Sequence, residues 1–416
     1  MKLVALKRVS SLPVKNGLGL SGSKADRNDP RYIRITDIGS DGCLREDVYA
    51  SQPRSLVGES WVKAGDVLIA SVGATVGKSY LHRVPGEYCF AGYLSRVRPN
   101  TKLLDSRFLY FWTQSKDYWK QIYTSLVSST IENLSASRIG SLSVPLPPLA
   151  RQRAIADFLA SETAEIDASI ADQFALIELA EERRQSTIDS YLYASGSRQT
   201  PLKHLGRLRT GITLGTQYDE QTQEYPYLRV ANVQTDRVDL TDIATVNVPP
   251  HVADANRLVT GDVLMTEGGD RDKLGRGALW HGEVKNMLHQ NHIFTFRCNE
   301  NLLPEYLVYV LESSKARYYF DITAKQSTNL ASTNSTTVKR FRVPFRRLEE
   351  QRAIVASLDI ECTALGETIA DAERTIELSR ERRVALISAA VTGQIDVTQK
   401  RKPVAEVLED GVGVRA

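Results

Sequence analysis

The sequence predicts an α+β protein in which two tandem α/β domains are separated by two long antiparallel helices that form a coiled coil, with a pseudo-twofold relation between the two halves. Three observations carry this prediction. One unit is written twice along the 416 residues. Each copy begins with strand-like runs and turn residues. Each copy ends in a long stretch whose apolar residues recur every three or four positions.

The repeat is visible as short strings that return in the same order. Equivalent residues are 195 or 196 positions apart in the first part of each copy and 199 apart from Arg98 and Arg297 onward. Insertions therefore fall early in each copy, and the last part keeps the strict register expected of a helix that presents one face along its length. The paired strings are Leu6-Lys7 and Leu202-Lys203, Tyr32-Ile33-Arg34-Ile35 and Tyr227-Leu228-Arg229-Val230, Gly65-Asp66-Val67-Leu68 and Gly261-Asp262-Val263-Leu264, Val144-Pro145 and Val343-Pro344, Gln152-Arg153-Ala154-Ile155 and Gln351-Arg352-Ala353-Ile354, and Glu182-Arg183-Arg184 and Glu381-Arg382-Arg383.

The two domains are predicted over residues 1–149 and 196–345. In the first, strand-like runs over 31–38 and 66–72 alternate with turn residues, and an amphipathic helix is predicted over 106–115. Its counterpart in the second domain begins at Pro304, a residue favoured at the first position of a helix. This mixture of strands and a helix predicts an α/β domain in each copy.

The helical regions are predicted over 150–195 and 346–392, followed by a flexible tail over 393–416. A helix over 150–192 would be roughly 65 Å long at about 1.5 Å per residue, which is longer than one domain needs. Each helix could pack on its own domain alone, but equal lengths and equivalent apolar positions favour pairing with each other. The predicted seam positions are Ile155, Leu159, Thr163, Ile166, Ile170, Gln173, Ile177, Ala180, Arg184, Ile188 and Tyr191, and then Ile354, Leu358, Cys362, Leu365, Ile369, Ala372, Ile376, Ser379, Arg383, Ile387 and Ala390.

Charge is unevenly distributed along the chain. The net charge is +8 over residues 1–149, −5 over 150–196, +2 over 197–345 and −2 over 346–416. Basic domains and acidic helices are expected if the domains contact nucleic-acid phosphates and the helices contact other proteins. For the second domain the excess is small enough to arise by drift.

Loops that differ between the two copies are the candidates for reading DNA, because two target sequences demand different side chains on one scaffold. Segment 71–78 is replaced by the longer and more charged 267–276, and segment 128–130 corresponds to 325–329. The candidate DNA-facing residues are Arg31, Arg34, Lys78, Ser128, Ser129, Thr130, Arg229, Arg271, Lys273, Arg276, Lys325, Gln326, Ser327, Thr328 and Asn329.

Catalytic motifs are missing from the sequence. Segment 73–79 has three residues instead of four between its glycines, so it is not a phosphate-binding loop. The two Pro-Pro pairs lack the polar and aromatic neighbours with which amino-methyltransferases hold a flipped base. The four cysteines and six histidines form no metal-ligand spacing. We expect no catalytic residue, metal or cofactor in this chain.

The chain resembles the specificity subunit of type I restriction-modification systems. The resemblance rests on the order and duplication of the Gly-Asp-Val-Leu strings, of the Val-Pro and Gln-Arg-Ala-Ile strings at the helix starts, and on the helix end over 389–397. The resemblance implies two target-recognition domains that read the halves of an asymmetric bipartite site on double-stranded DNA. It also implies docking of two methyltransferase subunits and of restriction subunits, which would carry AdoMet, ATP and Mg²⁺. The first helix departs from the pattern, because it ends through Ser195-Gly196-Ser197 without the Thr-Gly-x-Ile-Asp ending, which bears on how that end docks.

Three rivals share part of this evidence. They are the specificity component of a type IIB system that cuts on both sides of its site, a self-contained methyltransferase or nuclease, and a stand-alone DNA-binding regulator. We expect a cytoplasmic protein without a membrane partner. The cysteines are scattered without a disulfide framework, the N-terminus lacks the pattern of a signal peptide, and no apolar run reaches the length of a membrane span.

Overall fold

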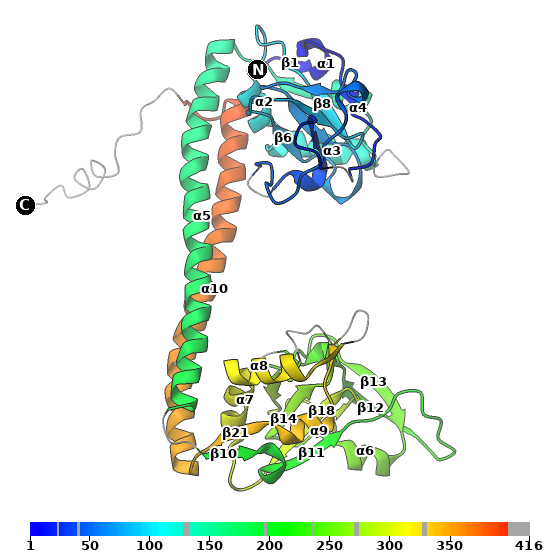
Figure 1. Cartoon of the computed structure of the whole chain (residues 1–416), viewed down its shortest axis with the longest axis vertical. Helices are drawn as coiled ribbons and strands as arrows, with labels where there is room; N and C mark the ends of the chain where they lie inside the picture. Colours follow the sequence, from blue (N-terminus) through cyan, green and yellow to red (C-terminus); the bar gives the residue numbers. More distant parts are fainter. Residues whose placement is uncertain are drawn as a thin grey trace, which may run out of the picture. The chain divides into compact units, whose positions relative to one another are not determined.

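The computed structural model describes residues 1–22, 25–39, 42–127, 133–194, 198–234, 237–269, 274–326 and 331–397. The chain divides into two compact units, shown in Figure 1. Unit 1 comprises Met1–Gln173 and the chain from Arg374 on, and unit 2 comprises Phe174–Glu373. Each unit therefore holds one mixed domain together with part of each long helix. No helix in the described part of the chain is long and apolar enough to span a membrane.

The domain of unit 1 is built on three small sheets. Its strands are β1 (Leu3–Ala5), β2 (Lys15–Asn16), β3 (Arg31–Ile33), β4 (Trp61–Val62), β5 (Val67–Ala70), β6 (Ser79–Leu81), β7 (Tyr88–Phe90), β8 (Leu94–Val97) and β9 (Ser143–Pro145). The largest sheet is antiparallel with the order β2-β8-β5-β6. A second sheet has the order β3-β7-β4, with β3 parallel to β7, and β1 pairs with β9.

Short helices complete this domain. They are α1 (Leu6–Val9), α2 (Ser106–Trp112), α3 (Lys116–Val127) and α4 (Ala136–Ser141). The helix predicted over 106–115 is confirmed as α2, which begins after Asp105 because the carboxylate of Asp105 accepts the N–H groups of Arg107 and Phe108. Fully buried aromatic side chains of α2 and α3, among them Phe108, Trp112 and Tyr118, pack on β5 in the main core.

One predicted strand is shorter than expected. The run 31–38 forms a strand only over Arg31–Ile33, and Ile35–Asp37 is a 3-10 helix. The carboxylate of Asp37 accepts the backbone N–H of Arg34 at 2.9 Å, which turns the chain out of the sheet. Alternating apolar residues alone do not reveal this local competitor of the sheet hydrogen bonds.

Unit 2 has the same kinds of sheet as unit 1, but the counterpart of β3 is the central strand of its three-stranded sheet, and a further small sheet lies among its described residues. The antiparallel four-stranded sheet has the order β11-β18-β14-β16, the three-stranded sheet has the order β13-β12-β17 with β12 parallel to β17, and β10 pairs with β21. The added sheet has the order β15-β20-β19. The strands are β10 (Arg198–Pro201), β11 (Gly206–Thr210), β12 (Gln223–Leu228), β13 (Ala244–Val248), β14 (Asp262–Thr266), β15 (Gly268–Gly269), β16 (Gly277–Leu279), β17 (Leu288–His289), β18 (Ile293–Cys298), β19 (Lys325–Gln326), β20 (Ala331–Ser332) and β21 (Arg342–Phe345).

The helices of this domain are α6 (Pro250–Asn256), α7 (Pro304–Glu312), α8 (Ser314–Thr323) and α9 (Ser335–Arg340). Helix α7 begins at Pro304, as predicted. Its fully buried Tyr306 and Leu307 pack with Phe294 and Phe296 of β18 in the core of unit 2. The two domains thus place the same kind of helix on the same sheet.

The long helices are α5 (Leu149–Leu192) and α10 (Leu348–Thr392). Every predicted seam position is buried or half-buried. Over residues 164–183, all of which are described, the shielded side chains are those of Ile166, Ile170, Gln173, Ile177 and Ala180. One narrow apolar stripe along a helix is the mark of a coiled-coil contact.

The two helices pair antiparallel, and their ends also pack on the domains. In the core of unit 1, Ile155 and Leu159 of early α5 lie with Ile387 and Ala390 of late α10. In the core of unit 2, Ile188 of late α5 lies with Leu358 of early α10. The predicted coiled coil is confirmed, and the packing of each helix on a domain occurs in addition to the pairing.

The repeated Gly-Asp-Val-Leu strings have a structural reason. Gly65 and Gly261 have φ values of +93° and +91°, in the left-handed region that glycine adopts most readily. The next residue, Asp66, is 1% exposed, accepts the N–H of Lys63 at 2.8 Å and binds the guanidinium of Arg98 at 2.6 Å. Asp262 makes the same contacts with Val259 and Arg297. The strings therefore fix a turn at the start of β5 and β14.

Buried glutamines explain the repeated helix entries. The side chain of Gln152 accepts the N–H of Asp105 at 2.9 Å and donates to the carbonyls of Leu103 and Pro147 at 2.9 and 2.8 Å. Gln351 makes the equivalent three hydrogen bonds in unit 2. Each glutamine joins the start of a long helix to the start of the domain helix α2 or α7.

Candidate nucleic-acid interface

The two candidate loops of unit 1 lie side by side, although they are far apart in the sequence. The N–H of Leu134 donates to the carbonyl of Ser71 at 2.8 Å, and Val72 forms an antiparallel bridge with Asn133. Lys78 follows the 3-10 helix Gly73–Thr75 between β5 and β6, and it is exposed. Ser128, Ser129 and Thr130 lie outside the described residues. The structure thus joins the flanks of both loops at one end of the main sheet.

Unit 2 places its corresponding loops in the same way. The N–H of Thr333 donates to the carbonyl of Glu267 at 2.8 Å, the counterpart of the bond between Leu134 and Ser71. Strand β20 pairs with β15 on one side and with β19 on the other. These loops therefore meet at the end of β14, as those of unit 1 meet at the end of β5.

The individual candidates of unit 2 differ in accessibility. Lys325 in β19 is exposed, and Arg276 before β16 is half-buried. Gln326 contributes its backbone to β19. Arg271, Lys273, Ser327, Thr328 and Asn329 lie outside the described residues.

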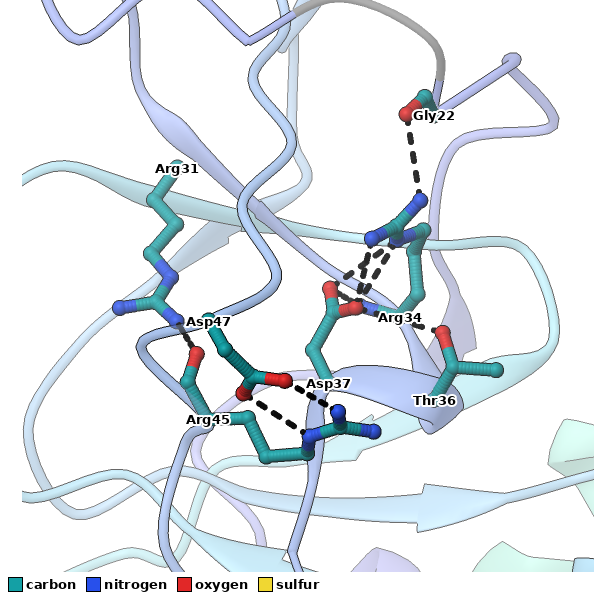
Figure 2. A network of polar contacts seen from close by, with 7 residues as sticks. All are labelled: Gly22, Arg31, Arg34, Thr36, Asp37, Arg45 and Asp47. Carbon is teal, nitrogen blue, oxygen red and sulfur yellow. Dashed lines mark hydrogen bonds and ion pairs between the residues drawn. The ribbon is translucent and has the colours of Figure 1, made fainter. Parts of the chain in front are cut away.

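Arg31 and Arg34 belong to an internal polar network of unit 1, drawn in Figure 2. Arg31 is 8% exposed and donates to the Glu46 carboxylate at 3.0 Å and to the Arg45 carbonyl at 2.5 Å. Arg34 binds the buried carboxylate of Asp37 through Nε at 3.0 Å and Nη2 at 2.7 Å. These bonds raise the pKa of Arg34 above its usual value. Both guanidinium groups hold the domain together in this structure.

Arg229, the counterpart of Arg34, has a different environment. Asn232 stands where unit 1 has Asp37, and its side-chain oxygen still accepts the N–H of Arg229 at 2.8 Å. Without a buried carboxylate, the guanidinium turns to the exposed Asp242. An ion pair in solvent contributes little stability. Arg229 is therefore more available to a ligand than Arg34.

Two exposed residues beside the loops were missed by sequence reasoning. The N–H of Ser71 donates to the carbonyl of Tyr93 at 2.9 Å, and the N–H of Glu267 donates to that of His292 at 2.9 Å. Tyr93 is 66% exposed, and the His292 side chain is 54% exposed and contacts Glu267 at 2.8 Å. Their spacing of 199 is the register of the later repeat, so equivalent but unlike residues in that register were the available signal.

In the described residues, the arrangement offers hydrogen-bond donors and positive charge. Among the residues that the structure places, no group of three or more His, Cys, Asp and Glu side chains is arranged to hold a metal ion. The buried histidines are kept neutral: burial lowers the pKa of His82, and it lowers the pKa of His289 to about 4. Burial raises the pKa of Cys89 and of Cys298 to about 12, so these thiols are not activated. The surface is suited to binding.

Comparisons with known proteins agree with this geometry. Residues 24–173 match the family described as type I restriction modification DNA specificity domain. The chain is 26% identical over 327 residues to the type I restriction enzyme EcoKI specificity subunit of Escherichia coli (strain K12), covering 74% of this chain and 70% of that protein. It is 23% identical over 328 residues to the StySPI specificity subunit of Salmonella potsdam, with the same coverage.

Solved structures show the same fold. A structure from work on the assembly and conformational transition of the type I R-M system matches with a TM-score of 0.73 and 16% identity, over 95% of this chain and 98% of that chain. The HsdS subunit from Thermoanaerobacter tengcongensis matches with a TM-score of 0.53 and 16% identity, over 95% and 97% of the two chains. The resemblance indicated by the repeated strings is thereby confirmed: residues 24–173 match the family described as type I restriction modification DNA specificity domain, and the chain as a whole resembles the specificity subunit of a type I restriction-modification system.

Proposed function

We propose that this chain is the DNA-reading, non-catalytic subunit of a type I restriction-modification complex, which binds an asymmetric bipartite site on double-stranded DNA and docks two methyltransferase subunits and restriction subunits. The observation that carries the proposal is the repeated loop pair. In both units, two loops distant in the sequence meet beside the end of one central strand, joined by an equivalent backbone hydrogen bond.

Unlike side chains on a like scaffold support two different half-sites. Unit 1 presents Lys78 and Tyr93 at this end of the sheet, and unit 2 presents Arg276, His292 and Lys325. Arg and Lys can bond to the acceptors of guanine, and His and Tyr can donate or accept at base edges or phosphates. Two surfaces with different donors are expected to select different bases.

Anchoring of the long helices supports a fixed separation between the half-sites. Arg383 of α10 donates to Asp167 of α5 and to Gln114 of the domain, both at 2.8 Å. Its counterpart Arg184 in α5 forms an ion pair with the buried Glu312 of α7. Each domain is thus tied to a long helix by a charged contact as well as by apolar packing, which suits the helices as a spacer.

The chemistry would come from the partners. Methyl transfer requires AdoMet, and cleavage requires ATP and Mg²⁺, and we assign all three to partner subunits. Incubating the purified chain alone with DNA and either AdoMet or Mg²⁺ should give neither methylated nor cut product. Product from the chain alone would favour the rival of a self-contained enzyme.

The test of sequence reading is methylome sequencing of a host that expresses the chain with the modification gene from its own neighbourhood. The expected motif has two different half-sites separated by an unspecified spacer. Replacing segments 267–276 and 325–333 with the equivalent loops of unit 1 should change one half-site and leave the other unchanged. A palindromic wild-type motif, or a loop exchange that changes both half-sites, would contradict the proposal.

A further inference from the structure

The edge strand β11 of unit 2 carries cationic side chains that lie outside the candidate loops. Lys203, Arg207 and Arg209, here called the β11 patch, line a hollow of about 440 Å³ together with His204 and Arg297. Lys203 and Arg207 are exposed, and Arg209 is half-buried. Strand β11 pairs with β18 on one side only, so its other edge is free of a strand partner in the four-stranded sheet.

Strand geometry places the two arginines on one face. Arg207 and Arg209 are two residues apart, so their side chains point to the same side of the sheet, about 7 Å apart along the strand. Leu208 between them packs against the core of unit 2. Across the ladder, Arg207 lies opposite Arg297 and Arg209 opposite Thr295. The result is a short row of guanidinium groups on one face of the sheet edge.

The charge of the patch is not neutralised by acidic neighbours. Arg297 donates to both oxygens of Asp262, at 2.7 and 2.8 Å, so its charge is balanced. For Lys203, Arg207 and Arg209 the structure, within its described residues, gives no ion pair with a carboxylate. Cations held close together without counter-charges repel one another, and an anionic ligand removes that repulsion.

Unit 1 has the same strand without such a patch. Strand β2 pairs with β8 as β11 pairs with β18, and Lys15 stands opposite Arg96. Lys15 forms an ion pair with Glu59 at 2.7 Å, and Arg96 is buried and donates to the carbonyls of Glu59 and Trp61. Lys15 and Arg96 therefore have partners within unit 1, and Lys7, the counterpart of Lys203, remains as an exposed cation near this edge. In the second domain, which has a net charge of only +2, Lys203, Arg207 and Arg209 lie together at this edge.

We propose that the β11 patch binds the phosphate backbone of double-stranded DNA beside the half-site read by unit 2; this inference rests on the proposed function. Guanidinium groups match phosphate oxygens in charge and geometry. Arg207 lies at the end of the sheet opposite the candidate loops, because Arg207 and Asp262 both pair with Arg297, whereas Thr266 at the other end of β14 lies beside the loop. Arg209 lies midway, at the level of Leu264, since both pair with Thr295. Along the strand, Arg207 is about 14 Å and Arg209 about 7 Å from the level of Thr266, or roughly four and two base-pair steps. The patch then grips phosphates that flank the bases, and supplies affinity without sequence preference.

The test measures DNA affinity of the full chain, co-purified with its modification subunits, as a function of salt. The duplexes carry either the recognised site or a scrambled one. In the Arg207→Gln/Arg209→Gln variant, the slope of log affinity against log salt should become shallower by about 1.8, since each neutralised phosphate contributes about 0.9. Affinity for both duplexes should fall by the same factor, and the methylated motif should not change.

Matched variants separate the explanations. Lys15→Gln removes the equivalent cation of unit 1, which is already paired with Glu59, and should leave the salt slope unchanged. Arg207→Lys/Arg209→Lys keeps the charge and should keep the slope. If the Gln variant misfolds, as judged by circular dichroism, Lys203→Gln/Arg207→Gln provides the same measurement.

Two results would overturn the inference. One is a salt slope in the Gln variant equal to that of the wild type. The other is loss of co-purifying subunits with an unchanged slope, which would make the patch a protein interface. Failure of the proposed function looks different, because the wild-type complex would then bind the recognised and scrambled duplexes equally.

Discussion

Replacing Gln152 with alanine should destabilise unit 1 far more than replacing the exposed arginine next to it in the sequence. The Gln152 side chain is fully buried and satisfies three backbone groups, those of Leu103, Asp105 and Pro147. Removing one partner of a buried hydrogen bond costs about 1–3 kcal/mol, so three such bonds give at least about 3 kcal/mol. For a unit of this size, that loss corresponds to a fall of about 6–12 °C in melting temperature.

The assay is differential scanning calorimetry of the full chain combined with hydrogen exchange, which reports on each unit separately. Gln152→Ala should speed exchange in α2 and in early α5, and Gln351→Ala should do the same for α7 and early α10. Arg153→Ala and Arg352→Ala are matched controls, because these neighbours are exposed. If each glutamine variant melted within 1–2 °C of its arginine control, our account of the repeated helix entries would be refuted.

Three further predictions concern the helices and one buried histidine. Arg184→Met strands the buried carboxylate of Glu312 and should cost about 2 kcal/mol in urea unfolding, whereas Arg184→Met/Glu312→Met should recover most of that loss; a double variant no more stable than the single one would contradict this. Burial lowers the pKa of His289 to about 4, so His289 takes up a proton near pH 6.5 in the unfolded chain but only near pH 4 in the folded one. The free energy of unfolding of unit 2 therefore has its full value above about pH 6.5 and falls by up to about 3 kcal/mol as the pH falls toward 4. His289→Gln should remove that part of the pH dependence, as measured by urea unfolding at about pH 7 and 4.5, and an unchanged dependence would disprove it. Inserting seven residues in α5 alone should disturb assembly of the complex. Matched insertions in α5 and α10 should lengthen the spacer of the methylated motif by about 10 Å, roughly three base pairs. An unchanged spacer length in the methylome would refute the role of the helices as a spacer.

Much of the fold follows from the sequence because each strand or helix of the repeated unit is encoded twice, by two different segments. The identical Gly-Asp strings predicted strands at the correct places, and the three-to-four spacing predicted both long helices to within a few residues. Short strands such as β2 and β4 could not be found this way. A strand of only two residues is too short to show an alternating pattern, and only its pairing with strands distant in the sequence makes it extended.

The candidate site was harder to predict, because the sequence does not show which basic side chains form ion pairs in the folded protein. In the sequence, Arg34 and Lys78 are both simply basic residues of the first domain. Only the fold places Asp37 beneath Arg34 and leaves Lys78 exposed. The reverse holds for the β11 patch, since Arg207 and Arg209 drew no attention in a domain of net charge +2. The relevant property is whether an acidic side chain is within reach, and strand register decides that.

The division of the chain through its long helices also has a consequence for biosynthesis. Unit 2 is one continuous stretch, Phe174–Glu373, whereas unit 1 is closed by Ile387, Ala390 and Val391, which are fully buried in its core. Domains usually complete their folding in order from the N-terminus as the ribosome releases them. Here we expect the reverse order, because unit 1 needs the last turns of α10 to complete its core. A chain that ends between residues 373 and 387 would contain all of unit 2 and lack the last core residues of unit 1.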